Sequence, residues 1–312
     1  MTNSLKNLQH LAVLLLVFGV SVLFAYFIAP IAKPIGESGL DNGAQAVGVR
    51  FLFLAVGAAL ILALCYFTRE HPAWAVTSRE VAYMAVGATL HAVFVWLFNG
   101  MTFPLPALSQ VALRPAVILP VFFGFVFGPV VGFMSGAVGS LIGDLFVGAV
   151  NPQWAFAYGI TGLCAGLPAI FAGKKHSLNV VTGFVAVGGV VTAIFYLANP
   201  ATQFSPPPDF APTSISFFLG MSVAVGAALA VLVRFAFPNR PDWGTVVLWG
   251  AAGNIIGLAV ASKADLWTQG DTLAQALVGK FIPTAGPNLI AVAILIPLLL
   301  FLYTSAQQSS GE

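Results

Sequence analysis

The sequence has very little charge. Of its 312 residues only 7% are Asp, Glu, Lys or Arg, whereas 59% are hydrophobic and the mean hydropathy is +0.96. Because soluble domains carry about 25% charged residues, this composition excludes a soluble globular enzyme. Twelve Lys and Arg against ten Asp and Glu leave a net charge of +2, too small to attract nucleic acid. The expected surroundings are the lipid bilayer.

Cysteine and the common catalytic motifs are also scarce. Cys65 and Cys164 both lie in apolar runs, so they predict neither a disulfide framework nor a metal cluster. The sequence contains no Gly-x-Ser-x-Gly elbow, nucleotide-binding P-loop, HExxH motif or paired acidic motif for metal-bound phosphates. We therefore expect no enzymatic activity and no cofactor, and the chain has no means of hydrolysing ATP by itself.

The sequence is rich instead in long apolar runs. A helix needs about 20 mostly apolar residues to cross about 30 Å of hydrocarbon. The runs lack the alternation of a membrane β-barrel, so they predict helices. We predict an all-α polytopic membrane protein with about ten transmembrane helices, at residues 8–29, 49–67, 81–98, 112–127, 130–150, 154–172, 178–197, 214–235, 243–261 and 285–303.

The positive charges predict the orientation of these helices. With the N-terminus in the cytoplasm, more Lys and Arg residues lie on the inner side than at the outer ends, as the positive-inside rule requires. The densest group, Lys174 and Lys175, falls in a short inner loop. We expect a multi-pass plasma-membrane protein with both termini in the cytoplasm. A charged stretch at residues 68–71, followed by another at 78–80, predicts a domain boundary after the first two helices.

Ionisable residues inside the spans are the first candidates for function. Asp144 is the acid expected to be most buried, and Arg114 enters from the same side of the membrane. The two residues either form an ion pair that fixes two helices or line a ligand pocket. His91 lies in the middle of its span and either hydrogen-bonds a neighbouring helix or relays protons.

Aromatic and amide side chains gather near the predicted outer ends. A flat heteroaromatic ligand needs aromatic faces and a few amide hydrogen bonds, although aromatic residues at this depth also serve as membrane anchors. An amide inside a span must find partners, and Pro283, Gly286 and Pro287 favour an opened backbone beside Asn288. The candidates are Trp96, Asn99, Phe103, Trp154, Tyr158, Trp267, Asn254 and Asn288.

Three segments in order carry a resemblance to a known family. Residues 113–133 contain Arg114-Pro115 and a Gly128-Pro129 turn, and are followed by glycines at 132, 136, 139 and 143. This stretch resembles the second and third helices of the substrate-binding S components of energy-coupling factor (ECF) transporters. Residues 154–167 look like the fourth helix of that family, and residues 287–300 look like the sixth. The resemblance covers residues 79–303.

The resemblance implies a six-helix bundle that binds its substrate near the outer face. It implies a lid formed by the loop at residues 99–111 and a contact with the membrane coupling subunit through Ala85, Ala88 and Ala92. Two hairpins are additional: one at residues 1–70, and one at about 178–236 inserted in an S-component-like domain at 79–305. The implied partners are a vitamin, the coupling subunit, ATPase subunits and the lipid bilayer, with no nucleic acid.

Three functions agree with these observations. The first is a substrate-binding subunit of an ECF-type importer for a vitamin or related micronutrient. A riboflavin-like heteroaromatic is the favoured ligand because Trp96, Phe103, Trp154 and Tyr158 offer rings for stacking. The second is a stand-alone transporter coupled to protons through Asp144 and His91. The third is a membrane scaffold in which the glycine faces only hold partner helices.

Overall fold

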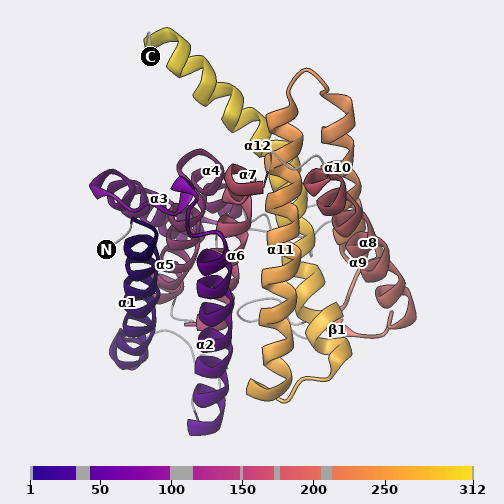
Figure 1. Ribbon diagram of the computed structural model, residues 1–312. Helices are drawn as coiled ribbons and strands as arrows, with labels where there is room; N and C mark the ends of the chain where they lie inside the picture. Colours follow the sequence, from indigo (N-terminus) through magenta and orange to yellow (C-terminus); the bar gives the residue numbers. More distant parts are fainter. Residues whose placement is uncertain are drawn as a thin grey trace.

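A computed structural model describes residues 3–32, 43–98, 115–147, 150–171, 176–204 and 213–310. Within these ranges eight helices are long and apolar enough to cross a membrane, and two apolar helical segments are shorter, Pro115–Phe127 and Ser222–Ala236. Each of the ten predicted spans falls on one of these segments. The protein is an all-α polytopic membrane protein, as predicted (Figure 1).

The described helices follow one another in this order along the chain. They are α1 Asn3–Ala32, α2 Ala44–Phe67, η1 Pro72–Trp74, α3 Ser78–Leu97, η2 Pro115–Val117, α4 Ile118–Phe127, α5 Pro129–Val147, α6 Pro152–Gly166, α7 Pro168–Phe171, α8 Ser177–Ala198, α9 Phe217–Gly220, α10 Ser222–Ala236, α11 Pro241–Thr268, the π-helix η3 Gln275–Phe281 and α12 Ile282–Ser310. Two short strands, β1 Gln203–Phe204 and β2 Thr213–Ser214, pair antiparallel between α8 and α9.

The connection between α2 and α3 is a packed segment. Trp74 is fully buried, and its indole Nε1 donates to Thr68 Oγ1 at 2.8 Å. The charged stretch at 78–80 starts α3, where the Glu80 carboxylate accepts the Thr77 backbone N–H at 2.9 Å in a capping box, an arrangement that stabilises a helix N-terminus. The charged residues at 78–80 therefore serve to begin a helix.

The predicted Gly-Pro turn joins α4 to α5. Gly128 has a φ of +107°, a conformation that glycine adopts without the penalty of a Cβ atom. Pro129 then occupies the first position of α5, where its missing N–H costs no hydrogen bond. The turn reverses the chain within one residue.

Glycines hold the central helices together. A Cβ atom at Gly132 would collide with the carbonyl of Gly162 on α6, and one at Gly139 would lie 2.7 Å from the Ala88 carbonyl on α3. Backbones this close leave no room for side chains. The predicted glycine face of α5 is thus confirmed, and it packs against both α6 and α3.

The two hairpins that were expected to be additional lie on opposite sides of the central helices. In Figure 1, α1 and α2 stand at the left, and α8 with α10 stands at the right of α11. Phe18 of α1 packs edge-on against Phe133 of α5, with ring centroids 6.2 Å apart. On the other side, Gly226 of α10 lies against Leu289 of α12. Both hairpins are therefore integrated into the core.

The structure corrects one helix boundary. The ninth span was predicted to end at residue 261, but α11 continues to Thr268. In this last segment Lys263 is exposed and Asp265 is buried. The two charged side chains therefore lie on different sides of the helix. The chain turns at Gly270, whose φ is +69°, as is common just after a helix.

Candidate functional site

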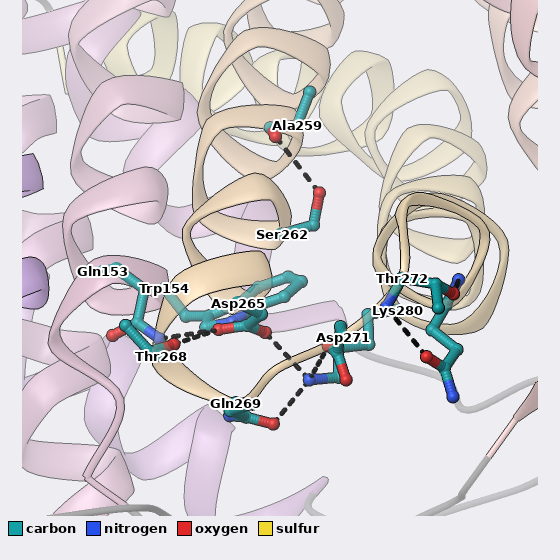
Figure 2. A network of polar contacts seen from close by, with 11 residues as sticks. Gln153, Trp154, Ala259, Ser262, Asp265, Thr268, Gln269, Asp271, Thr272 and Lys280 are labelled. Carbon is teal, nitrogen blue, oxygen red and sulfur yellow. Dashed lines mark hydrogen bonds and ion pairs between the residues drawn. The ribbon is translucent and has the colours of Figure 1, made fainter. Parts of the chain in front are cut away.

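Three elements meet at one end of the bundle: the C-terminal end of α11, the start of α6 and the π-helix η3. Asp265 of α11 lies at their centre and is 1% exposed. Its Oδ1 accepts the Gln153 Nε2 at 3.0 Å, and its Oδ2 accepts the Trp154 Nε1 at 3.3 Å. Figure 2 shows these side chains converging from α6 and α11.

Two further donors complete the surroundings of this carboxylate. Thr268 Oγ1 donates to Asp265 Oδ1 at 3.2 Å, and the Lys280 ammonium on η3 lies 3.1 Å from Oδ2. Lys280 also contacts Asp271 and Gln269, each at 2.5 Å. Gln153, Trp154, Asp265, Thr268 and Lys280 form what we call the Asp265 cluster. Burial of the carboxylate is tolerated because it is both paired and hydrogen-bonded.

The sequence did not single out Asp265, and Asp144 was wrongly expected to be the most buried acid. Asp144 is only half-buried, and its Oδ2 accepts the Asn151 backbone N–H at 3.3 Å. A signal for Asp265 did exist. It follows Asn254 by eleven positions, which places both residues on one face of a continuous helix. Ending the span at residue 261 concealed that relation.

The two candidate amides are fully buried. Asn254 of α11 and Asn288 of α12 have exposures of 0%. Among the described residues, neither the nitrogen nor the oxygen of either side chain has a hydrogen-bond partner. Because a buried polar group left unpaired costs about 1–3 kcal/mol, these amides are expected to receive their partners from a bound molecule or from water.

His91 belongs to the interface of three helices. Its Nδ1 lies 3.1 Å from the Ser135 carbonyl of α5, and its ring meets the Tyr158 ring of α6 edge-on at 5.7 Å. This is the helix-to-helix hydrogen bond that the sequence left open as one alternative. Nε2 is buried and finds no partner within the described segments.

The remaining candidate residues either face away from the bundle or lie outside the described residues. Trp96 is 56% exposed and Trp267 is 60% exposed, so both rings face the surroundings of the bundle, as membrane anchors do. Trp96 therefore does not join Trp154 and Tyr158. Asn99, Phe103, Arg114 and the expected lid at 99–111 lie outside the described residues.

The alanines expected at a coupling surface divide between two faces of α3. Ala88 and Ala92 are 6% and 2% exposed, and they face Gly139 and Gly143 of α5. That packing already occupies them, which corrects the expectation that they contact a partner. Ala85 alone of the three is exposed.

Comparison with known proteins identifies the central part of this chain. Residues 75–205 match the family model described as the S component of an ECF-type riboflavin transporter. These residues form an ECF S-component domain. The S-component match begins just before α3 and runs through α8 and β1, so α1 and α2 precede it and α10, α11 and α12 follow it.

Several curated relatives are UPF0397 proteins. One from Vibrio atlanticus is 33% identical over 93 residues, which are 29% of this chain and 48% of that protein. One from Aliivibrio salmonicida is 31% identical over 32% of this chain and 52% of its own length. One from Lactococcus lactis is 35% identical over 32% and 50%. The chain spans about half the length of these relatives, and no solved structure matches it.

Proposed function

We propose that this protein is the membrane-embedded substrate-binding subunit of an ECF-type importer, and that it captures a vitamin or related micronutrient. The observation that carries the proposal is the pair of fully buried amides, Asn254 and Asn288, without partners among the described residues. They lie in α11 and α12, and α11 also carries Asp265. Such amides suit a ligand that supplies the missing hydrogen bonds.

The substrate enters from the outside in this proposal. With both termini in the cytoplasm, α11 starts near Arg234 and Arg240 on the inner side and runs outward, so the Asp265 cluster lies at the outer face. Trp154 in the first turn of α6, and Tyr158 about one turn further along the helix, supply aromatic surface. A flat, riboflavin-like heteroaromatic fits rings of this kind combined with amides.

The domain organisation follows the same proposal. Residues 79–305 form the S-component-like unit, with the hairpin at about 178–236 inserted and the hairpin at 1–70 additional. The coupling and ATPase subunits supply the energy for uptake.

The surface offered to the coupling subunit is the exposed side of α3, where Ala82, Ala85 and Thr89 lie, since small residues permit close helix contact.

Ligand identification combined with uptake tests the proposal. The full chain is purified in detergent from cells grown with a vitamin mixture, and the bound small molecule is identified by mass spectrometry. Uptake of that vitamin is then measured with and without the coupling and ATPase subunits. We expect one vitamin at equal stoichiometry and uptake only with the partners. Uptake without partners that a protonophore abolishes indicates the proton-coupled carrier instead, and an empty protein without uptake indicates the scaffold.

A further inference from the structure

An apolar groove runs between α8 and α10. Its volume is about 420 Å³, within the range of about 300–1,000 Å³ that small-molecule sites occupy. Small residues leave this space open, because Gly189 of α8 lies directly against Ala227 of α10. Several lining side chains are exposed, so the groove opens to the surroundings of the bundle, which are the lipid of the membrane; they include Ala186, Val190, Ala228, Leu232 and Phe235.

A polar group closes one end of the groove. The Arg234 guanidinium of α10 donates to Thr182 Oγ1 and Asn179 Oδ1, and to the Leu178 carbonyl at 3.3 Å. Thr182 lies one turn before Ala186 on α8, and positions four apart are neighbours on a helix surface. The guanidinium carbon is also 5.2 Å from the ring centroid of Phe235, which lines the groove. The apolar groove therefore leads directly to a cation.

Arg234 retains capacity for an anion. Its three acceptors among the described residues are neutral oxygens, and a guanidinium has more N–H groups than these contacts use. No carboxylate of the described residues pairs with Arg234 or with Arg240. Arg240 adds positive charge at this end, since it lies over the Trp243 ring and the next residue, Gly244, packs against Arg234. The planar fork of an arginine matches a phosphate group.

We propose that this groove binds an anionic phospholipid, with an acyl chain between α8 and α10 and the phosphate on Arg234. Such a lipid joins an acidic group to an apolar chain, in the order in which the cation and the groove follow one another. In the orientation proposed above, Arg234 lies on the inner side, where the cytoplasmic leaflet is negatively charged and basic pockets between helices bind acidic headgroups. The proposal goes beyond the proposed function, because its ligand is a membrane component and not the imported substrate.

The shape of the groove favours a lipid chain over a partner helix. Gly189 and Ala227 are buried and form its floor, whereas Val190, Leu232 and Phe235 at its sides are 59%, 58% and 65% exposed. A narrow floor between projecting side chains accepts a thin hydrocarbon chain. A helix with its side chains is about 10–12 Å across, so it would rest on the projecting residues and leave the floor uncovered.

The test measures lipid binding to the full chain by native mass spectrometry. The protein is delipidated in detergent and titrated with phosphatidylglycerol or phosphatidylcholine of identical acyl chains, which differ in the net charge of the headgroup. Inorganic phosphate is the third probe, because it carries the acid without a chain. Two variants separate the parts of the site: Arg234→Gln removes the cation, and Ala228→Leu fills the groove.

Each variant has a matched control. Arg69 is also half-buried, lies 4.5 Å from the centroid of the Tyr66 ring and pairs with no carboxylate of the described residues. It follows α2, which stands on the other side of the central helices from α8 and α10 (Figure 1), so Arg69→Gln removes an equivalent charge away from the groove. Ala198 is exposed on α8 and is not a lining residue, so Ala198→Leu adds the same bulk outside the groove.

We expect one phosphatidylglycerol per protein, bound about tenfold more tightly than phosphatidylcholine, the effect of a hydrogen bond to a charged group. Arg234→Gln should bind the two lipids equally, and Ala228→Leu should weaken both of them. Arg69→Gln and Ala198→Leu should behave as the wild-type protein does. Inorganic phosphate at the concentration of the lipid should not displace it, because it lacks the chain that fills the groove.

Several outcomes overturn the proposal. Equal binding of the two lipids by the wild-type protein, or a preference that survives in Arg234→Gln, excludes a headgroup on Arg234. Binding that Ala228→Leu does not weaken excludes a chain in the groove, and displacement by inorganic phosphate excludes a lipid as the source of the anion. A dimer that Ala228→Leu dissociates, without any lipid preference, assigns the groove to a second copy of the chain. If Arg234→Gln fails to fold, the wild-type comparison and Ala228→Leu still decide, and none of these results depends on whether a vitamin binds.

Discussion

At the scale of single residues, the most informative feature is a buried amide whose hydrogen-bonding groups are unused. Asn288 is fully buried and has no partner among the residues that the structure describes. Replacing it with Leu removes the cost of that unpaired amide, about 1–3 kcal/mol. We predict that Asn288→Leu keeps or raises the melting temperature of the ligand-free protein in detergent, while vitamin binding weakens by about tenfold or more. Unchanged affinity in calorimetry would remove Asn288 from the site.

Trp154 combines a ring with a hydrogen bond, and two substitutions separate these roles. Its Nε1 donates to Asp265 Oδ2 at 3.3 Å. Trp154→Phe keeps an aromatic face and loses this bond, and Trp154→Ala loses both. If the ring stacks on the substrate, Ala should weaken binding more than Phe, by a further factor of about ten, since an aromatic pair contributes about 0.5–1.5 kcal/mol beyond the burial of its area. Equal affinities for the two variants would exclude stacking.

At the scale of elements, close backbone contact between α5 and α6 should dominate stability. A methyl group at Gly132 would collide with the carbonyl of Gly162, and backbone atoms yield less easily than side chains. We predict that Gly132→Ala destabilises the protein by about 1–3 kcal/mol, the usual cost of overpacking. The measurement is thermal unfolding in detergent.

Gly183 of α8 is the matched control for that variant. It also lies inside a helix, but a Cβ atom there meets nothing within 4 Å. Gly183→Ala should leave the melting temperature unchanged or raise it, because alanine favours helix more than glycine does. If both variants behave alike, the contact between α5 and α6 is looser than described.

At the scale of the whole molecule, orientation in the membrane decides whether the site faces the outside. Ala201 is exposed in the turn between α8 and β1, at the end that holds the Asp265 cluster, and Asn239 is exposed in the turn between α10 and α11. The natural Cys65 and Cys164 are both buried. A membrane-impermeant maleimide should therefore label Ala201→Cys in intact cells and Asn239→Cys only after permeabilisation. The opposite pattern would place the Asp265 cluster in the cytoplasm.

The sequence by itself determined much of this protein because the bilayer imposes simple requirements. Apolar length alone located the ten spans, since every backbone group in lipid must be satisfied within a helix. Gly128 and Pro129 specified a turn through their own backbone preferences. Asn254 and Asn288 stood out because polar groups are rare in apolar runs, and both are buried in the fold.

The tertiary structure alone decided which side chains meet. Gln153 and Asp265 are 112 positions apart in the chain, and no local pattern records that the start of α6 lies beside the end of α11. Likewise, only the packing of α3 on α5 shows that Ala88 and Ala92 face inward while Ala85 faces outward. The positions of the membrane spans depend on the medium that surrounds each segment, so they can be predicted from the segment alone. A binding site depends on the distances between segments, and these are fixed only when the helices pack.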